Sequence, residues 1–244
     1  MLLNLFVTVA HAADPEMGFT LAEIWQTSGT IAKATIGLLV LMVLVCTYVT
    51  IERLIAFNRS RNQSMALAAE IVGPMKKGDV SAALAVARDE RFEAAYLSNL
   101  LRSALKAIEE RFDEHGLRNA ERSLGKAIVE EQGKMRRGMA ILATTGSTAP
   151  FIGLFGTVVG VINAFQGMAT AGTGLGPISQ GIAEALITTA IGIGVAVLGV
   201  WAFNYFNGRI EKVTDEMIAS EVDFSDWATK ILLDRSEEQA KASK

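Results

Sequence analysis

Cysteine and histidine are almost absent from this 244-residue chain. Cys46 is the only cysteine, so no internal disulfide can form, and a thiolate metal site would need several thiols. The two histidines, His11 and His115, are far apart and lack the spacing of metal ligands, so we expect both to be solvated surface residues. The sequence therefore predicts neither a disulfide nor a metal site.

Motifs of catalysis and nucleotide binding are missing as well. No nucleophile–base pair or phosphate-binding loop occurs, and the glycine-rich segment 172–176 follows no strand, so it is not a dinucleotide loop. The net charge is −3, without the basic patch interleaved with aromatics that is typical of nucleic-acid binding. We expect no enzymatic activity, no cofactor and no nucleic-acid partner.

Charge is scarce along long stretches, although charged residues make up 20% of the chain. No charged side chain occurs in residues 34–51, 138–183 or 185–208. Uncharged apolar runs of about 18 residues or more are typical of transmembrane helices. The pattern predicts an all-α integral membrane protein with three transmembrane helices.

The charged segments carry helical periodicity. Gly78 and Asp79 indicate a turn followed by a helix N-cap, and Gly116 indicates a second break. From Leu117 onward the apolar spacing continues toward the second uncharged run, which predicts one long helix passing into the membrane. Residues 210–231 keep apolar spacings of three and four, which favours a further packed helix.

The first 13 residues leave two interpretations open. Ala10-His11-Ala12 resembles a signal-peptidase site, but no Lys or Arg precedes the short apolar core. The segment is either a weak cleaved signal peptide or an apolar helix at the outer membrane face. Both interpretations place the N-terminus outside the cytoplasm.

Basic residues cluster on one side of the uncharged runs, from Arg53 after the first run to Lys212 after the third, and neither the first 30 residues nor the 169–179 turn contains Lys or Arg. By the positive-inside rule, the N-terminus lies outside and the C-terminus lies in the cytoplasm. The expected organisation is an extracytoplasmic N-terminal segment 1–33, transmembrane helix 34–57, cytoplasmic helical domain 58–138, transmembrane helix 139–168, short outer loop 169–180, transmembrane helix 181–208, cytoplasmic C-terminal helix 209–235 and disordered tail 236–244.

Small residues mark the second and third spans. Gly153, Gly156 and Gly160 leave one side of the second helix nearly bare, and Gly156 with Gly160 forms a small-xxx-small pair that permits close helix approach. Pro150 lies near the cytoplasmic end of the same span, and Gly192 is the matching small residue in the third. We expect these five residues to serve helix packing.

Polar side chains at membrane depth gather on the same two spans. Thr157 lies in the second span, and Glu184, Thr188 and Thr189 lie in the third, with Glu184 and Thr188 on one helix face. An ionisable residue at this depth is a functional-site hypothesis, although Glu184 is also consistent with the outer edge of the span. Each threonine alone is consistent with bonding to its own helix, but the cluster favours a polar path between subunits.

The residues from Leu142 to Phe165 and from Gly181 to Gly192 resemble the second-span and third-span signatures of the MotA/TolQ/ExbB proton-channel family. The three-span layout is similar to the ExbB/TolQ branch. The resemblance implies a ring-forming oligomer, a pentamer in relatives, in the bacterial inner membrane. The ring surrounds a dimer of an ExbD/TolR-like single-span protein and acts on a TonB/TolA-like protein.

Carried over residue by residue, the resemblance implies that Thr157 and Thr189 line the pore and that Glu184 is the third-span acid of the family. The resemblance also implies that the partner helix carries the Asp that takes up and releases protons; the first two spans of this chain contain no Asp or Glu at mid-bilayer depth. Thr188 replaces an alanine that is common in relatives. Because its extra hydroxyl could supply an oxygen ligand for Na⁺, the identity of the transported ion, proton or sodium, stays open.

Three functions remain open at this point. The first is a motor subunit that uses the proton motive force to energise a process at the outer membrane. The second is a related motor that drives gliding or surface motility. The third is a passive membrane scaffold in which glycine and threonine only pack helices.

Overall fold

The computed structural model describes residues 29–171 and 175–242, and every regular element in those ranges is a helix. The expectations for the first 28 residues lie outside the described residues. The helices are α3 (Thr30–Lys76), α4 (Val80–Ala87), the 3-10 helix η1 (Glu90–Phe92), α5 (Tyr96–Glu110), α6 (Glu114–Met135), α7 (Met139–Ala171) and α8 (Leu175–Ala242).

Three helices are long and apolar enough to cross a membrane: α3, the part of α7 from Met139 to Gly167, and the part of α8 from Gly181 to Glu237. This confirms the predicted all-α class with three helices able to cross a membrane. The chain divides into two units. Of the described residues, the membrane unit comprises 29–46, 143–171 and 175–201, and the domain unit comprises 47–142 and 202–242.

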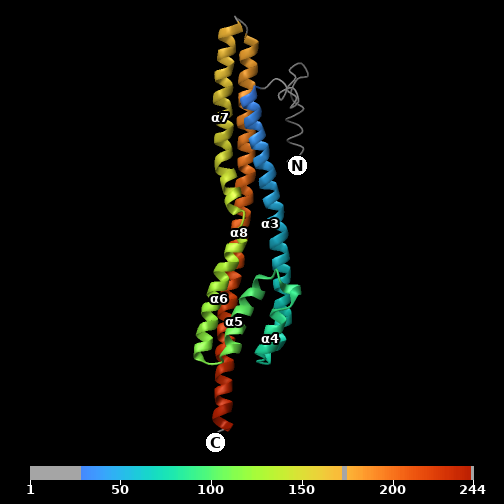
Figure 1. Cartoon of the computed structure of the whole chain (residues 1–244), viewed down its shortest axis with the longest axis vertical. Helices are drawn as coiled ribbons and strands as arrows, with labels where there is room; N and C mark the ends of the chain where they lie inside the picture. Colours follow the sequence, from blue (N-terminus) through green and yellow to red (C-terminus); the bar gives the residue numbers. More distant parts are fainter. Residues whose placement is uncertain (1–28, 172–174, 243–244) are drawn as a thin grey trace. The chain divides into compact units, whose positions relative to one another are not determined.

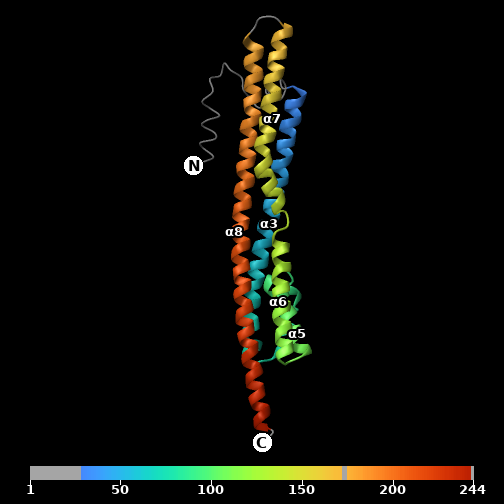
Figure 2. The ribbon, with the colours of Figure 1, turned by 90° about the vertical axis from the view of Figure 1, so that its left-hand side faces the viewer.

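In the membrane unit, α7 runs beside the first part of α8 (Figures 1 and 2). α3 packs against this pair through Leu39, which forms a buried cluster with Ala149, Val195 and Ala196. Two of these four side chains are alanines, so the helix backbones approach closely. In lipid, such close packing replaces the hydrophobic effect as the main source of helix association.

In the domain unit, α5 packs against both α4 and α6. Asp79 caps α4 as predicted, because its carboxylate accepts a hydrogen bond of 2.9 Å from the backbone N–H of Ala82. Leucines from each of these helices are buried, including Leu84, Leu100 and Leu124. The domain therefore has a hydrophobic core of its own.

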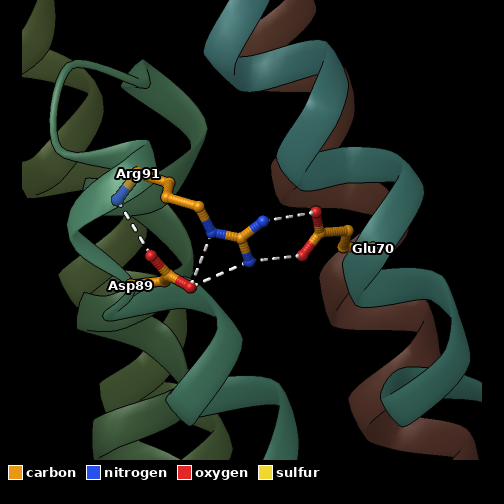
Figure 3. Close-up of polar contacts among 3 residues, drawn as sticks. All are labelled: Glu70, Asp89 and Arg91. Atoms are coloured by element: carbon orange, nitrogen blue, oxygen red, sulfur yellow. Dashed lines mark hydrogen bonds and ion pairs between the residues drawn. The ribbon is translucent and has the colours of Figure 1, made fainter.

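Arg91 joins η1 to α3 on the surface of the domain unit (Figure 3). Its guanidinium donates to both carboxylate oxygens of Glu70, at 3.2 and 3.0 Å, and its Nε donates to Asp89 at 3.0 Å. The hydrogen bonds from Arg91 lower the pKa of Asp89, and the two carboxylates raise the pKa of Arg91. All three side chains are solvated, so this contact contributes little to stability.

The expected continuous helix from Leu117 into the membrane is wrong. α6 ends at Met135 with Arg136 as its C-cap, and Gly138 has a φ of +76°, a left-handed conformation that terminates helices. Glycine is required there for a second reason, because a Cβ at Gly138 would lie 2.9 Å from Cγ1 of Val49. α7 then begins at Met139 as a separate helix.

Three other boundaries differ from expectation. Gly116 lies inside α6, and the break falls at Asp113, whose carboxylate caps the helix by accepting from Gly116 N–H at 2.8 Å. α7 continues to Ala171 and α8 begins at Leu175, so most of the expected outer loop, residues 169–180, is helical. The expected disordered tail is helical to Ala242, because Glu, Gln, Ala and Lys in this segment are good helix formers.

Candidate ion-path residues in the membrane unit

The crossing of α7 and α8 depends on two glycines. A Cβ at Gly153 would lie 2.8 Å from the carbonyl oxygen of Thr188, and a Cβ at Gly192 would lie 2.7 Å from the carbonyl oxygen of Ala149. Both obstacles are backbone atoms, which cannot rotate away. The two helices therefore reach this separation only without side chains at these positions.

The other two predicted packing glycines of α7, Gly156 and Gly160, contact side chains of neighbouring helices. A Cβ at Gly156 would lie 2.7 Å from Oγ1 of Thr188 and 3.1 Å from Cγ2 of Thr35, and a Cβ at Gly160 would lie 2.9 Å from the Cβ of Ala185. Each glycine thus accommodates a side chain of a neighbouring helix. α7 remains helical through Pro150, which is partly buried.

Thr157 and Thr189 form a directed chain of hydroxyl groups between the two helices. Thr189 Oγ1 donates to Thr157 Oγ1 at 3.3 Å, and Thr157 Oγ1 donates to the carbonyl oxygen of Leu154 at 2.6 Å. Both threonines are partly buried, so the pair lies at the edge of the helix contact and not in its centre. A group that approaches this edge can reach two neutral hydroxyls at once.

Thr188 occupies a different position from the one expected of a pore-lining residue. Its side chain is fully buried, and its hydroxyl donates to the carbonyl oxygen of Ala185 at 2.7 Å, with the carbonyl oxygen of Gly153 at 3.4 Å. Thr188 therefore fills the space opposite Gly156 inside the helix contact. This placement gives its hydroxyl a packing contact, and the suggested role of Thr188 as an ion ligand stays a prediction.

Glu184 lies against the start of α3. Its Oε1 accepts a hydrogen bond of 3.1 Å from the backbone N–H of Gly29, the residue before α3 begins. A carboxylate at a helix N-terminus is favourable because the free N–H groups there carry partial positive charge. Glu184 and Thr189 are five residues apart, about 140° around the helix, so they do not share a face.

The structure therefore divides the four predicted polar residues into two groups. Thr157 and Thr189 meet at one edge of the α7–α8 contact, whereas Glu184 and Thr188 face other neighbours. Two contributors escaped the sequence analysis: Gly29, which donates to Glu184, and Thr35, which is 5% exposed and packs against Gly156. Neither Gly29, which lies five residues before the first uncharged run, nor Thr35, which lies inside it, carried a sequence signal.

The chemistry available at the Thr157–Thr189 pair is proton donation and acceptance by neutral groups. Neither hydroxyl is a fixed charge, and the Thr157 hydroxyl already has a carbonyl partner in Leu154. A carboxylate brought to this edge can take that hydrogen bond by rotation of one hydroxyl. Within residues 29–171 and 175–242, no cluster of three or more His, Cys, Asp or Glu side chains is arranged to hold a metal ion.

Comparison with known proteins matches residues 92–219 to the model of the MotA/TolQ/ExbB proton channel family. The Tol-Pal system protein TolQ of Pseudomonas aeruginosa is 49% identical over 86 residues, which cover 35% of this chain and 37% of TolQ. The biopolymer transport protein ExbB of Xanthomonas campestris pv. campestris is 43% identical over 100 residues, or 41% of this chain and 38% of that protein. The biopolymer transport protein ExbB of Salmonella typhimurium is 49% identical over 77 residues, 31% of this chain and 32% of the relative. The matches thus span about two fifths or less of these relatives' length.

Proposed function

Because this chain belongs to the MotA/TolQ/ExbB proton channel family, in its ExbB/TolQ branch, we propose that it is a subunit of a proton-driven motor in the bacterial inner membrane. In this proposal several copies form a ring, a pentamer as in relatives, around a dimer of an ExbD/TolR-like single-span protein. The motor uses the proton motive force to energise a TonB/TolA-like protein that acts at the outer membrane. The names of the matched relatives, Tol-Pal system protein and biopolymer transport protein, support this assignment.

The hydroxyl pair of Thr157 and Thr189 is the observation that carries the proposal. The spans contain no central carboxylate of their own, so the partner helix supplies the acid that binds and releases the proton. That acid needs a polar surface when it is ionised, and the two hydroxyls provide one without a fixed positive charge that would hold it. The transmembrane potential contributes about 2.3 kcal/mol per charge per 100 mV, which drives the cycle.

Glu184 has a positioning role in this proposal. By fixing the start of α3 through Gly29, its carboxylate holds the first span against α8 at the outer end of the bundle. The flanking basic residues support an orientation with the N-terminus in the periplasm and the C-terminus in the cytoplasm. In that orientation the domain unit lies in the cytoplasm.

The test replaces each hydroxyl by a methyl group of similar size. Thr157→Val, Thr189→Val and the double variant are expressed with the ExbD/TolR-like partner in a host that lacks its own ExbB/TolQ-type subunits. We expect each single variant to lower energy-dependent outer-membrane function by about tenfold or more, since one charge-assisted hydrogen bond contributes about 1.5–3 kcal/mol. Protein abundance in the membrane is measured in parallel.

Thr148→Val is the matched control. Thr148 lies on the same helix, and its hydroxyl donates only to the carbonyl oxygen of Thr144 at 2.7 Å. We expect this variant to keep full function. If the Thr157→Val/Thr189→Val double variant also kept full function at normal abundance, a passive scaffold would account for the data better than a motor.

A further inference from the structure

The domain unit contains a cavity of about 470 Å³ lined by charged and apolar side chains. Its walls come from residues 52–60 of α3, residues 93, 94 and 99, and residues 131–137 around the end of α6. Cavities of this volume hold small molecules or headgroups. None of these residues belongs to the hydroxyl pair or the glycine contact described above.

The cavity lies next to the ends of two uncharged runs. Arg59 is two residues beyond Phe57, the last residue of the expected transmembrane helix 34–57, and Arg137 directly precedes Gly138, the first residue of the second run. The polar headgroup layer extends about 5–8 Å beyond the hydrocarbon core, and a helix rises 1.5 Å per residue. The mouth of the cavity is therefore at headgroup depth.

The charges around the cavity are unequal. It is lined by four cations and three carboxylates: Arg53, Arg59, Lys134 and Arg137 against Glu52, Glu93 and Glu131. Two of the carboxylates have cationic partners inside the protein. Glu52 pairs with Arg53, and the buried Glu131 accepts from Lys134 and, at 2.6 Å, from Asn99.

Two cations remain available for a ligand. Within the described part of the chain, the guanidinium groups of Arg59 and Arg137 make no hydrogen bond or ion pair, and both side chains are exposed. They face one remaining carboxylate, that of Glu93, so the cavity has an excess of one positive charge. An excess of one charge matches a phosphodiester, which carries a single negative charge, better than a doubly charged free phosphate.

The apolar part of the wall is also exposed. Ile55 lies on α3 between the paired Arg53 and the available Arg59, and it is 63% exposed. On a helix that leaves the membrane at this point, an exposed apolar side chain is able to contact the acyl chains of lipids. Charged and apolar groups are thus arranged side by side, as the headgroup and acyl chain of a phospholipid require.

We propose that this cavity binds an anionic phospholipid, with Arg59 and Arg137 binding the phosphodiester and Ile55 contacting the acyl chain. Basic pockets beside transmembrane helices recognise anionic headgroups in this manner. The bound lipid would join α3 to the segment between α6 and α7, in which Gly138 adopts its left-handed conformation. The site does not depend on the proposed motor function.

The experiment measures binding of fluorescently labelled phosphatidylglycerol to the full-length protein in detergent micelles by fluorescence anisotropy, with labelled phosphatidylcholine as the neutral comparison. A cation near a lipid surface contributes about a fivefold preference for anionic lipid, so Arg59→Gln/Arg137→Gln should weaken phosphatidylglycerol binding about 25-fold. Phosphatidylcholine has the same phosphodiester, but its choline cation cancels the attraction of the cavity's excess positive charge, so its binding should be weaker from the start and fall by much less than about 25-fold. Ile55→Ser should weaken binding of both lipids.

The matched control is Arg122→Gln/Lys230→Gln, which removes two exposed positive charges from other parts of the domain unit. We expect it to bind phosphatidylglycerol as the unmodified chain does. Equal losses in the two double variants would overturn the proposal, because surface charge alone would then explain binding. Displacement by inorganic phosphate at the concentration of the lipid would instead indicate a free-anion site and would also overturn it.

Folding and function are separated by two further measurements. Thermal unfolding checks that the Arg59→Gln/Arg137→Gln variant is folded, and Ile55→Ser tests the site without changing its charge. Thr157→Val/Thr189→Val should bind phosphatidylglycerol normally. Results that contradict the motor proposal can therefore be distinguished from results that contradict the lipid proposal.

Discussion

The contact between α7 and α8 leads to a quantitative prediction for Gly192→Ala. The added Cβ would lie 2.7 Å from the carbonyl oxygen of Ala149 and 3.0 Å from the Cα of Gly153. Ordinary contacts of this kind begin at 3.4 Å, so the two backbones must separate locally by about 0.7 Å. No rotamer change relieves the contact, since both obstacles are backbone atoms.

The cost of this separation follows from the packing that it disrupts. Overpacking a well-packed contact typically costs about 1–3 kcal/mol, and in lipid no hydrophobic effect compensates for it. The same shift would lengthen the 3.3 Å hydrogen bond between Thr189 and Thr157 beyond hydrogen-bonding distance. Gly192→Ala should therefore lower both stability and any function that depends on the hydroxyl pair.

The assay is thermal unfolding of the purified full-length protein in detergent, followed by far-ultraviolet circular dichroism. Gly194→Ala is the matched control, because it makes the same chemical change two residues along α8, where a Cβ would meet no atom within 4 Å. We expect a lower midpoint for Gly192→Ala and an unchanged or higher midpoint for Gly194→Ala, since alanine favours helix formation.

A double-mutant cycle makes the test sharper. Gly153 and Gly192 contact each other, so one separation of the helices accommodates both new methyl groups. The double variant Gly153→Ala/Gly192→Ala should be only slightly less stable than the worse single variant. Additive losses, or equal effects of Gly192→Ala and Gly194→Ala, would refute the reasoning that this contact limits the helix separation.

Three other predictions concern contacts within a single unit. Gly156→Ala should lower the unfolding midpoint because its Cβ would lie 2.7 Å from Oγ1 of Thr188, and adding Thr188→Ala should restore part of the loss in the same assay. Tyr96→Phe should cost about 1.5–3 kcal/mol in urea unfolding, because the buried Tyr96 hydroxyl donates to the Glu216 carboxylate at 2.7 Å. Burial and this hydrogen bond raise the pKa of Tyr96, so its contribution is present below pH 10 and is lost at higher pH. The helix-capping hydrogen bond from the Gly116 N–H lowers the pKa of Asp113 below its usual 3.8. The stability that the Asp113 carboxylate contributes should therefore be lost as the pH falls below about 4. Unfolding midpoints measured between pH 7 and pH 3 should show this pH-dependent loss in the unmodified chain and lack it in Asp113→Asn.

Helix termini show where sequence reasoning succeeded and where it failed. The cap at Asp79 was predictable because the interaction is local, between a side chain and a backbone N–H three residues away. The break between α6 and α7 was missed because Gly138 has no local signal stronger than that of Gly133, which remains helical. The deciding difference is the proximity of Val49, which is 89 residues away in the sequence.

The polar residues of the membrane unit show the same limit. Their depth and chemistry were readable from the sequence, but a helical pattern does not say which neighbour each face meets. Thr188 and Thr189 are adjacent, yet the first is buried in the helix contact and the second reaches Thr157. The partner of Glu184, the backbone N–H of Gly29, carries no side chain by which a sequence pattern could reveal it.

The sequence by itself determined the helical class, the three membrane spans and the family, because these depend on long uncharged runs and on short motifs within one or two helices. Tertiary structure alone decided which hydroxyls meet, where α6 stops, and which cations are left without a partner around the α3–α6 cavity. The physical reason is distance. Hydrophobic patterning acts along one helix, whereas a hydrogen bond or a glycine contact between helices depends on atoms that are brought within about 4 Å only after the helices pack.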